Sequence, residues 1–316
     1  MNSSRFLRIA AAAAASLLVV TLVSEARTPD ATVPVRMTVT LNLGEGKRMP
    51  EVKQEDVIVR QGKERLPVAE WVPATGNHAG LDLFILIDDA SETRLGVQLN
   101  DLRNFINAQG PATAVGVGYM RNAGVTVVQD FTTDHAAAAK ALRLPMASTG
   151  AYGSPYLSLI SLLKRWPDDP NRREVIMVTD GIDRARRTFR AWGLEAISPD
   201  VDVASEVAQR TGTMVHSIYF PGIGRHHRNF WEMNMGQNGL SKLADETGGE
   251  SFYLGIHPPV SFAPYLDQIQ QILDNQYLLT FHAKPGKKSR LQSVTLATEV
   301  AGVEFGSADS VFVPVK

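Results

Sequence analysis

Residues 83–93 read LFILIDDASET, an apolar run that ends on two carboxylates and then enters a polar turn. An apolar run closed by aspartate is typical of a strand buried on both faces of a parallel sheet. In open α/β sheets the site lies at the carboxyl ends of such strands. Asp88 and Asp89 are therefore the first candidate site residues.

The sequence around this strand alternates strand and helix patterns from residue 80 to residue 256. Apolar residues recur at helical spacing over 95–106, and residues 174–179, EVIMVT, form a second strand-like run that is followed by Asp180. Residues 121–124, RNAG, separate two strand-like runs and indicate one antiparallel hairpin. The pattern predicts a single α/β domain over 80–256 with a doubly wound, mainly parallel sheet.

Strand-like segments flank this domain on both sides. Residues 33–73 contain runs with the period of two that half-buried strands show, and a Gly-containing linker follows. Residues 262–316 begin with a helical pattern and continue with three strand-like runs that have no helices between them. Because short isolated sheets are rarely stable, we expect the two segments to pair into a small β-sandwich-like domain.

The N-terminal 26 residues have the pattern of a secretory signal peptide. Arg5 and Arg8 precede an apolar core over 9–23, and Ser24-Glu25-Ala26 supplies small residues for cleavage. The competing interpretation is an uncleaved membrane anchor, for which the core is somewhat short. We expect export to the periplasm or the extracellular space, with no membrane span after cleavage.

The composition narrows the class of protein further. The chain has 316 residues, of which 44% are hydrophobic, and its formal net charge of −1 gives no electrostatic argument for nucleic-acid binding. It contains no cysteine, which excludes disulfides, thiolate catalysis and cysteine-based zinc sites. A Gly-x-Ser-x-Gly elbow, a Walker-type loop and a His-Glu-x-x-His helix are all absent from the sequence.

The order of the candidate residues resembles a known family. The Asp88 strand end is followed by a Gly-rich loop that places Ser154 before a helix, and then by a strand ending in Thr179-Asp180-Gly181. This order is similar to that of the von Willebrand factor type A (VWA) domain, which has a Rossmann-like fold. With the flanking β segments and the tripeptide at 275–277, NQY, the chain resembles the VWFA-related subgroup of exported bacterial proteins.

The resemblance implies a site for Mg²⁺ or Mn²⁺, built from carboxylate and hydroxyl oxygens. If Asp88 leads the motif, the two hydroxyl positions that follow are occupied by Ala90 and Glu92. Asp180 matches fully, and Ser154 replaces the family's threonine. In this register we expect a degenerate metal-ion-dependent adhesion site that keeps its shape and binds no cofactor.

An alternative register starts one residue later. If Asp89 leads, Ser91 and Thr93 restore both hydroxyls, and Ser154 and Asp180 complete the site. A shift of one residue points the leading carboxylate to the opposite side of an extended strand. This alternative predicts a Mg²⁺-dependent adhesion module.

An arginine-rich segment follows Asp180 and suggests a surface for a protein partner. Arginine and tryptophan are common anchors at interfaces. The candidate partner-binding residues are Arg184, Arg186, Arg187, Arg190 and Trp192. The alternative is a solvated loop whose aromatic residues pack onto the domain.

The function that these features predict is an exported, non-enzymatic, adhesion-type module that binds a protein. The Mg²⁺-dependent module is the first alternative, with its site built either on Asp89, Ser91 and Thr93 or on Asp88 with Ser154 and Asp180. A hydrolase is the second, in which Ser154, Asp180 and a loop histidine form a hydrolytic set.

Overall fold

The computed structural model describes residues 32–43, 50–148, 153–185, 197–223, 230–253 and 257–315. The chain divides into two compact units, Met1–Asp30 and Ala31–Lys316, and all described residues belong to the second. The predicted signal peptide, residues 1–26, lies outside the described part of the chain. Within the described part, no helix is long and apolar enough to cross a membrane.

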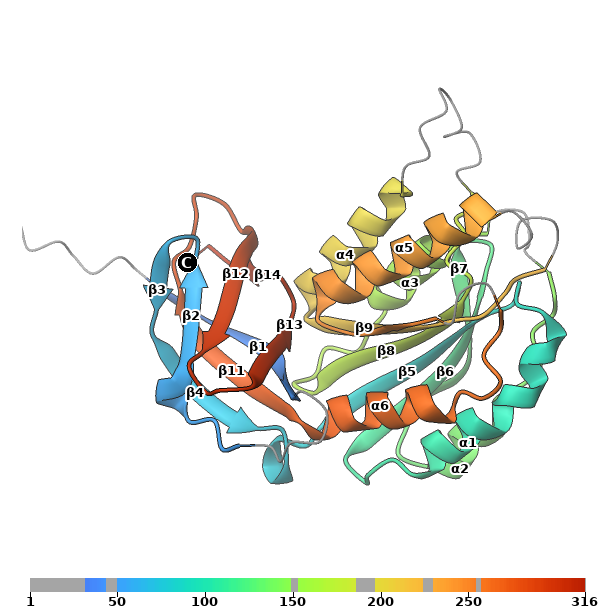
Figure 1. Ribbon diagram of the computed structural model, residues 1–316, viewed down its shortest axis with the longest axis horizontal. Coiled ribbons are helices and arrows are strands. Elements are labelled where there is room, and N and C mark those ends of the chain that lie inside the picture. The colour runs from blue at the N-terminus through green and yellow to red at the C-terminus, as the bar shows by residue number, and fades with distance from the viewer. Residues whose placement is uncertain are drawn as a thin grey trace, which may run out of the picture. The chain divides into compact units, whose positions relative to one another are not determined.

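A six-stranded sheet forms the centre of the α/β region, in the order β10-β9-β8-β5-β6-β7 (Figure 1). Its strands are β5 (Leu81–Asp88), β6 (Thr113–Arg121), β7 (Gly124–Thr132), β8 (Arg172–Thr179), β9 (Thr213–Tyr219) and β10 (Ser251–Phe252). Neighbouring strands are parallel except β7, which pairs antiparallel with β6 through the predicted hairpin. The predicted fold class is confirmed.

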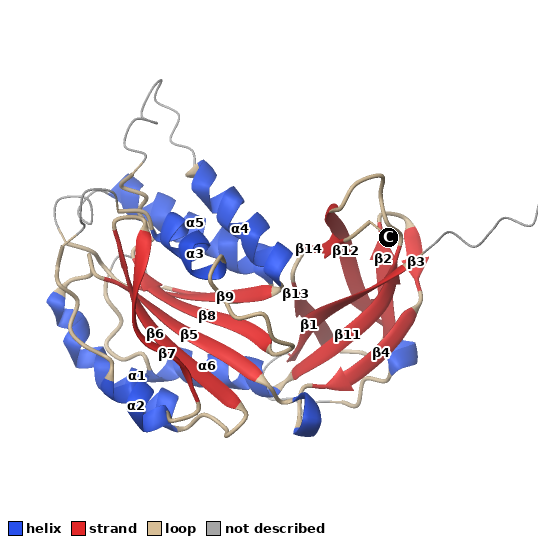
Figure 2. Ribbon diagram, turned by 180° about the vertical axis from the view of Figure 1, so that it is seen from behind, coloured by secondary structure: helices blue, strands red, loops and turns tan. Residues whose placement is uncertain are grey.

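Helices cover both faces of this sheet (Figures 1 and 2). One face carries α1 (Leu99–Asn107), α2 (His135–Lys140) and α6 (Ala263–Asp274), and the other carries α3 (Pro155–Leu163), α4 (Pro199–Thr211) and α5 (Phe230–Thr247). A short 3-10 helix, η3 (Thr93–Gln98), precedes α1. Successive strand residues point to opposite faces of the sheet. Because helices cover both faces, every residue of β5 is buried.

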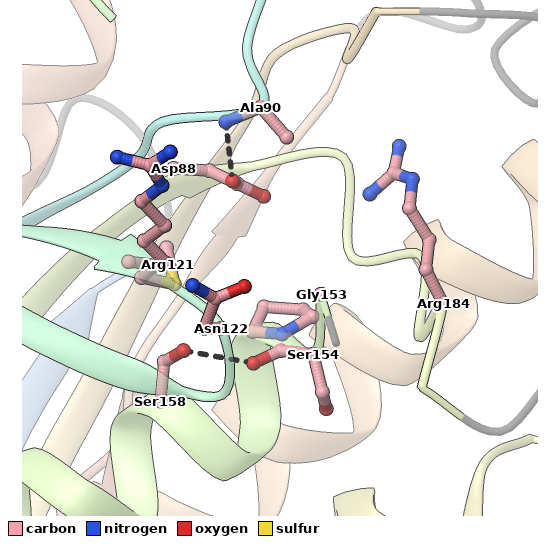
Figure 3. Close-up of a pocket in the computed structure, with 10 residues that line it drawn as sticks. Asp88, Ala90, Arg121, Asn122, Gly153, Ser154, Ser158 and Arg184 are labelled. Carbon is pink, nitrogen blue, oxygen red and sulfur yellow. Dashed lines mark hydrogen bonds between the residues drawn. The ribbon is translucent and has the colours of Figure 1, made fainter. Parts of the chain in front are cut away.

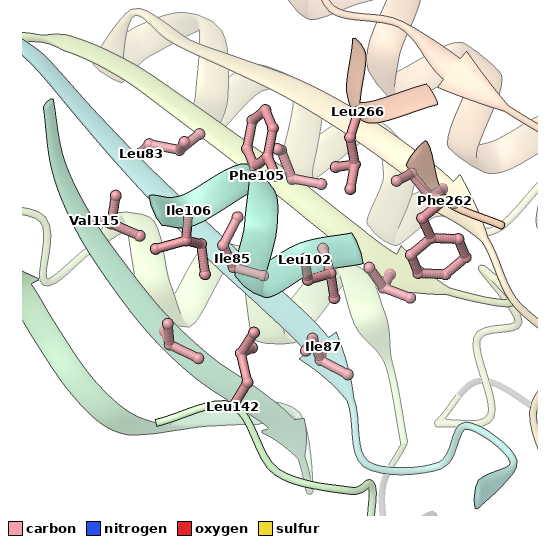
Figure 4. Packing of buried hydrophobic residues seen from close by; sticks show 14 of the residues in the cluster. Leu83, Ile85, Ile87, Leu102, Phe105, Ile106, Val115, Leu142, Phe262 and Leu266 are labelled. Carbon is pink, nitrogen blue, oxygen red and sulfur yellow. The ribbon is translucent and has the colours of Figure 1, made fainter. Parts of the chain in front are cut away.

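The side chains on the two faces of β5 belong to two separate hydrophobic cores. Leu83, Ile85 and Ile87 pack against α1, whose Leu102 and Ile106 are fully buried, as the predicted helical spacing requires (Figure 4). Phe84 and Leu86 belong to the core under α3, α4 and α5. The sequence pattern predicts α6 as the start of the C-terminal β segment. The helix contributes residues to the first core, however, so it packs as part of the α/β region.

Strands from both ends of the described chain form two four-stranded antiparallel sheets, ordered β13-β1-β11-β4 and β14-β12-β2-β3. They comprise β1 (Val33–Leu43), β2 (Val57–Gln61), β3 (Glu64–Leu66), β4 (Val68–Pro73), β11 (Gln276–Ala283), β12 (Arg290–Thr298), β13 (Val303–Ser307) and β14 (Ser310–Val313). Short 3-10 helices, η1 (Gln54–Asp56) and η2 (Gly76–His78), lie in the connections. Val39, Val59 and Phe281 belong to one common core, so the two sheets stabilise each other.

A closed polar cluster, the buried tetrad Arg172, Glu174, His216 and Gln276, joins β8, β9 and β11. Gln276 Nε2 donates to Glu174 Oε1 at 2.7 Å, and Arg172 Nη1 donates to Gln276 Oε1. The other Glu174 oxygen lies 2.9 Å from His216 Nε2, while His216 Nδ1 accepts the Glu250 N–H. That acceptor role assigns the proton of a neutral imidazole to Nε2.

Candidate functional site

The ends of β5 and β8 bring two of the predicted residues together. The strands are parallel neighbours, with Ile87 opposite Val178, so their terminal carboxylates lie at one edge of the sheet. Thr179 Oγ1, from the end of β8, donates to Asp88 Oδ2 at 2.8 Å. The Ala90 N–H donates to Asp88 Oδ1 at 2.8 Å (Figure 3). We call this edge, where β5, β6, β8, β9 and β10 end, the carboxyl edge.

The environment of Asp88 favours its neutral form. Burial, followed by the charge of Asp180, raises the pKa of Asp88 to about 6. The guanidinium of Arg184 and the hydrogen bonds from Ala90 and Thr179 act in the opposite direction and are outweighed. Asp88 and Asp180 thus lie near one cation, Arg184.

Asp180 is paired with a cation from its own loop. Arg184 Nη1 donates to Asp180 Oδ1 at 3.2 Å, and Arg184 Nη2 donates to Oδ2, a two-point contact typical of guanidinium and carboxylate. The side chain of Arg184 is only 7% exposed and that of Asp180 is fully buried. Arg184, predicted at a partner surface, therefore lies inside the site. Gly181 allows the tight turn between them, with φ of 70°.

Asp89 faces a different part of the molecule from Asp88. Arg143 donates to both oxygens of Asp89, from Nη1 at 2.7 Å and Nη2 at 2.9 Å, and the Met146 N–H donates at 3.2 Å. The guanidinium carbon of Arg143 lies 3.7 Å from the centroid of the Tyr119 ring. The geometry therefore places Asp88, not Asp89, beside Asp180, as the alternation of strand side chains requires.

The hydroxyls of the alternative register do not join Asp180. Ser91 is buried, and its Oγ has no hydrogen-bond partner among the described residues. Its backbone pairs instead with Gly222 in an isolated bridge. Thr93 begins η3. The carboxylate of Glu92 accepts a hydrogen bond from Arg94 Nε at 2.8 Å.

Ser154 lies at the pocket but serves the next helix. Its Oγ caps α3 by accepting the Leu157 N–H at 3.3 Å, and its backbone oxygen accepts from Ser158 Oγ at 2.9 Å. Figure 3 shows this pocket, whose volume is about 10 Å³, roughly the space of one water molecule. It is lined by Asp88, Ala90, Met120, Arg121, Asn122, Gly153, Ser154, Pro155, Ser158 and Arg184.

The loops at this edge are tied together by backbone hydrogen bonds. The N–H groups of Arg184 and Ala185 donate to Gly153 O at 2.7 and 3.0 Å. The Ile223 N–H donates to Ala90 O at 2.8 Å, and the Glu92 N–H donates to Pro221 O at 3.1 Å. The loops after β5, β8 and β9 and the turn before α3 thus hold one another.

This donor set does not fit a divalent metal ion. Such an ion needs free carboxylate and hydroxyl oxygens at about 2.0–2.6 Å. Both oxygens of Asp180 are engaged by Arg184, Ser154 Oγ caps a helix, and Ala90 supplies no oxygen side chain. The described residues also contain no group of three or more histidine or acidic side chains arranged to hold a metal.

Four predicted partner residues, Arg186, Arg187, Arg190 and Trp192, lie outside the described part of the chain. Sequence reasoning did not single out Arg143, because it is separated from Asp89 by 54 positions and sits in a stretch without periodicity. It also missed a set of exposed apolar side chains at the carboxyl edge. Leu144 and Met146, 53% and 56% exposed, follow Arg143 directly.

Comparison with solved structures finds similar folds at low sequence identity. A membrane protein from Bacteroides fragilis described as aerotolerance-related gives a TM-score of 0.44 at 13% identity, covering 62% of this chain and 99% of that chain. The SpRpn10 VWA domain gives 0.39 at 11% identity, covering 59% and 94%. The human COPII-coat protein Sec24c gives 0.44 at 10% identity, covering 74% and 44%. Neither a family model nor a curated protein matches the chain.

Proposed function

We propose that the chain is an exported, non-enzymatic binding module of the VWA type, and that it docks a protein partner on the carboxyl edge of its central sheet. The residue order of Asp88, Ser154 and Thr179-Asp180-Gly181 supports the VWA-type assignment. The carboxyl edge is also where open α/β sheets carry their binding sites.

The observation that carries the proposal is the distribution of exposed apolar side chains. Ten large hydrophobic residues are exposed in the described part of the chain. Seven of them lie in loops, in η3 or at the start of α5, at the carboxyl edge: Val97, Leu144, Met146, Phe230, Trp231, Tyr253 and Val260. Single exposed apolar residues are ordinary, but their concentration on one edge is typical of a protein-binding surface.

A basic side chain accompanies these apolar residues. Arg121 is exposed at the end of β6, and its Nη1 lies 3.4 Å from Met146 Sδ. Arginine beside methionine and aromatic residues is the composition found at the centres of protein interfaces. We therefore assign the partner contact to Arg121 and the exposed apolar residues of the carboxyl edge, with the arginine-rich segment 186–192 as a further contact.

The module works without a metal or a catalytic group in this proposal. The engagement of Asp180 by Arg184 argues against a cation-dependent contact. The helix-capping role of Ser154 and the absence of histidine from the residues that line the pocket argue against hydrolysis. Export rests on the signal-peptide pattern of residues 1–26.

The test is site-specific photo-crosslinking in the cell envelope of the producing organism. A photoreactive amino acid at Met146 or Trp231 is expected to capture one defined partner. The same group at Val203, which is 46% exposed on α4, is the matched control and is expected to capture none. Equal capture of the same protein from all three positions, or capture from Val203 alone, would contradict the proposed face.

A further inference from the structure

Two buried carboxylates at adjacent strand ends require a compensating positive charge. Leaving a charged group buried without a partner costs several kcal/mol, so native proteins supply a counter-charge or neutralise the group. At the carboxyl edge Asp88 is buried and the side chain of Asp180 is fully buried. In the residues that line the pocket, the buried cation next to them is Arg184.

We propose that Arg184 is the resident cation of this site: its guanidinium supplies the positive charge that a divalent ion supplies in a VWA-type site, and the carboxyl edge is assembled without metal. The inference deepens the proposed function, because it fixes how the binding face is held in shape. Its test uses the protein alone, so it succeeds or fails independently of any partner.

The geometry of the pair supports this role. The guanidinium contacts both oxygens of Asp180, and its charge also acts on Asp88. Burial lowers the pKa of Arg184, but the charge and hydrogen bonds of Asp180, with the charges of Asp88 and Glu232, together raise it by more, so the net shift is upward. Arg184 therefore contacts Asp180 directly and acts on Asp88, which lines the same pocket, through its charge.

The surrounding backbone is shaped around this pair. A Cβ atom at Gly222 would overlap Asp180 Oδ2 and lie only 2.7 Å from Arg184 Nη2. Glycine at this position therefore lets the backbone after β9 approach the ion pair. Any side chain there would displace one of the two charged groups.

Protein contacts also provide the cross-links between loops that a bound ion would provide. Thr179 joins the β8 end to Asp88, and Arg184 N joins the β8 loop to Gly153 O. The bridge between Ser91 and Gly222 joins the loops after β5 and β9. The edge thus holds its shape with charge and hydrogen bonds from its own chain.

Asp89 and Arg143 give a matched control pair in the same loop region. Asp89 is buried and is bound at both oxygens by a guanidinium, as Asp180 is. The two sites differ in that the second carboxylate, Asp88, stands beside Asp180. They differ also in that the side chain of Arg143 is 31% exposed, against 7% for Arg184. Removing either arginine leaves a buried carboxylate, but only removal of Arg184 leaves two carboxylates together for a divalent ion.

The test is thermal unfolding of the purified protein in EDTA and in millimolar MgCl₂ or MnCl₂ at matched ionic strength, with calorimetric titration of the same ions. The wild-type Tm is expected to be the same in all three solutions, with no heat of binding. Arg184→Ala is expected to lower Tm in EDTA by roughly 5–8 °C. Mg²⁺ or Mn²⁺ should restore about 2 °C at ten times the dissociation constant.

Three further variants keep the test decisive. Arg184→Lys, which keeps the charge but not the two-point contact, is expected to have a lower Tm that stays insensitive to Mg²⁺. Arg143→Ala is expected to lose stability and gain no response to Mg²⁺. Adding Asp180→Asn to Arg184→Ala should abolish the response.

A Mg²⁺ or Mn²⁺ response of the wild-type protein would overturn the proposal even if Arg184→Ala does not fold. An equal response of the Arg143→Ala and Arg184→Ala variants would also overturn it.

Discussion

Two polar clusters at opposite ends of the strands of the central sheet are built differently. At the carboxyl edge, Asp88 and Asp180 share Arg184 beside a small pocket. At the amino end, in the buried tetrad, the amide of Gln276 links Arg172 to Glu174 by hydrogen bonds. His216 Nε2 is hydrogen-bonded to the same carboxylate.

The difference lies in what each cluster connects. The tetrad joins residues 102 positions apart and fixes the first residue of β11 onto the α/β sheet. From that point Tyr277 stacks on Trp71 of β4, with ring centroids 4.5 Å apart. The carboxyl-edge cluster joins loops at the edge of the sheet that also carries exposed apolar side chains. A closed cluster thus stabilises the fold, and a cluster that borders solvent shapes a surface.

The largest effect is expected from breaking the closed cluster at Glu174. Glu174→Ala leaves the Arg172 guanidinium, whose pKa burial already lowers, without its carboxylate, and leaves His216 Nε2 without an acceptor. The free energy of unfolding should fall by about 3–5 kcal/mol. Urea unfolding measures this change.

The matched control for that substitution is Glu206→Ala, which removes an exposed glutamate from α4. It should change the free energy of unfolding by less than about 0.5 kcal/mol. If the Glu174→Ala variant lost no more stability than this control, the tetrad would not be the stabilising element that its burial indicates.

The next effect is a pH dependence at the carboxyl edge. The pKa of Asp88 is about 6 in the folded protein and 3.8 in a free aspartate, so the folded state takes up this proton first as the pH falls. Its contribution to stability is therefore present below about pH 4 and is lost as the pH rises through about 6, a change of about 3 kcal/mol.

Asp88→Asn isolates this contribution, because asparagine does not titrate. The stability of the variant minus that of wild type should grow by about 3 kcal/mol between about pH 4 and pH 8. Chemical unfolding at a series of pH values gives the difference. A difference that stays constant over this range would show that Asp88 titrates alike in the folded and unfolded states.

The fold class could be predicted from the sequence because its signals are local. The apolar run of 83–87 is typical of a buried strand, and the apolar stripe over 95–106 is typical of an amphipathic helix. The RNAG turn indicates the antiparallel strand at the edge of the sheet. The sequence placed α6 with the C-terminal β segment, but the helix packs on the core of the α/β region. Adjacency in sequence does not show which core a helix joins.

The site could be predicted in part. Strand ends located Asp88 and Asp180, because parallel strands place their carboxyl ends at one edge. The sequence could not show that Arg184 turns back onto Asp180, since that depends on the turn at Gly181 and on the space at Gly222. The partner of Asp89, Arg143, is a long-range contact that local patterns do not reveal.

A smaller effect is expected at the amide that links the tetrad. Gln276→Leu keeps the volume of the side chain but removes the hydrogen bonds to Glu174 and Arg172. The free energy of unfolding should fall by about 1–3 kcal/mol, the cost of unsatisfied buried polar groups. Gln268→Leu, at an exposed position of α6, is the control. Equal stability of the two variants would mean that Gln276 only fills space.

The smallest effect on stability is expected at the exposed side chains of the carboxyl edge. Leu144→Ser and Met146→Ser should each change the free energy of unfolding by less than about 1 kcal/mol, because both side chains are more than half exposed. If they form the partner contact, each should weaken partner binding by about tenfold or more, as truncation of an interface anchor does. Val203→Ser, on α4, should change neither quantity. A large loss of stability at Leu144 or Met146 with unchanged partner binding would assign these residues to the fold, and the contrast between a stabilising end and a binding end of the sheet would fail.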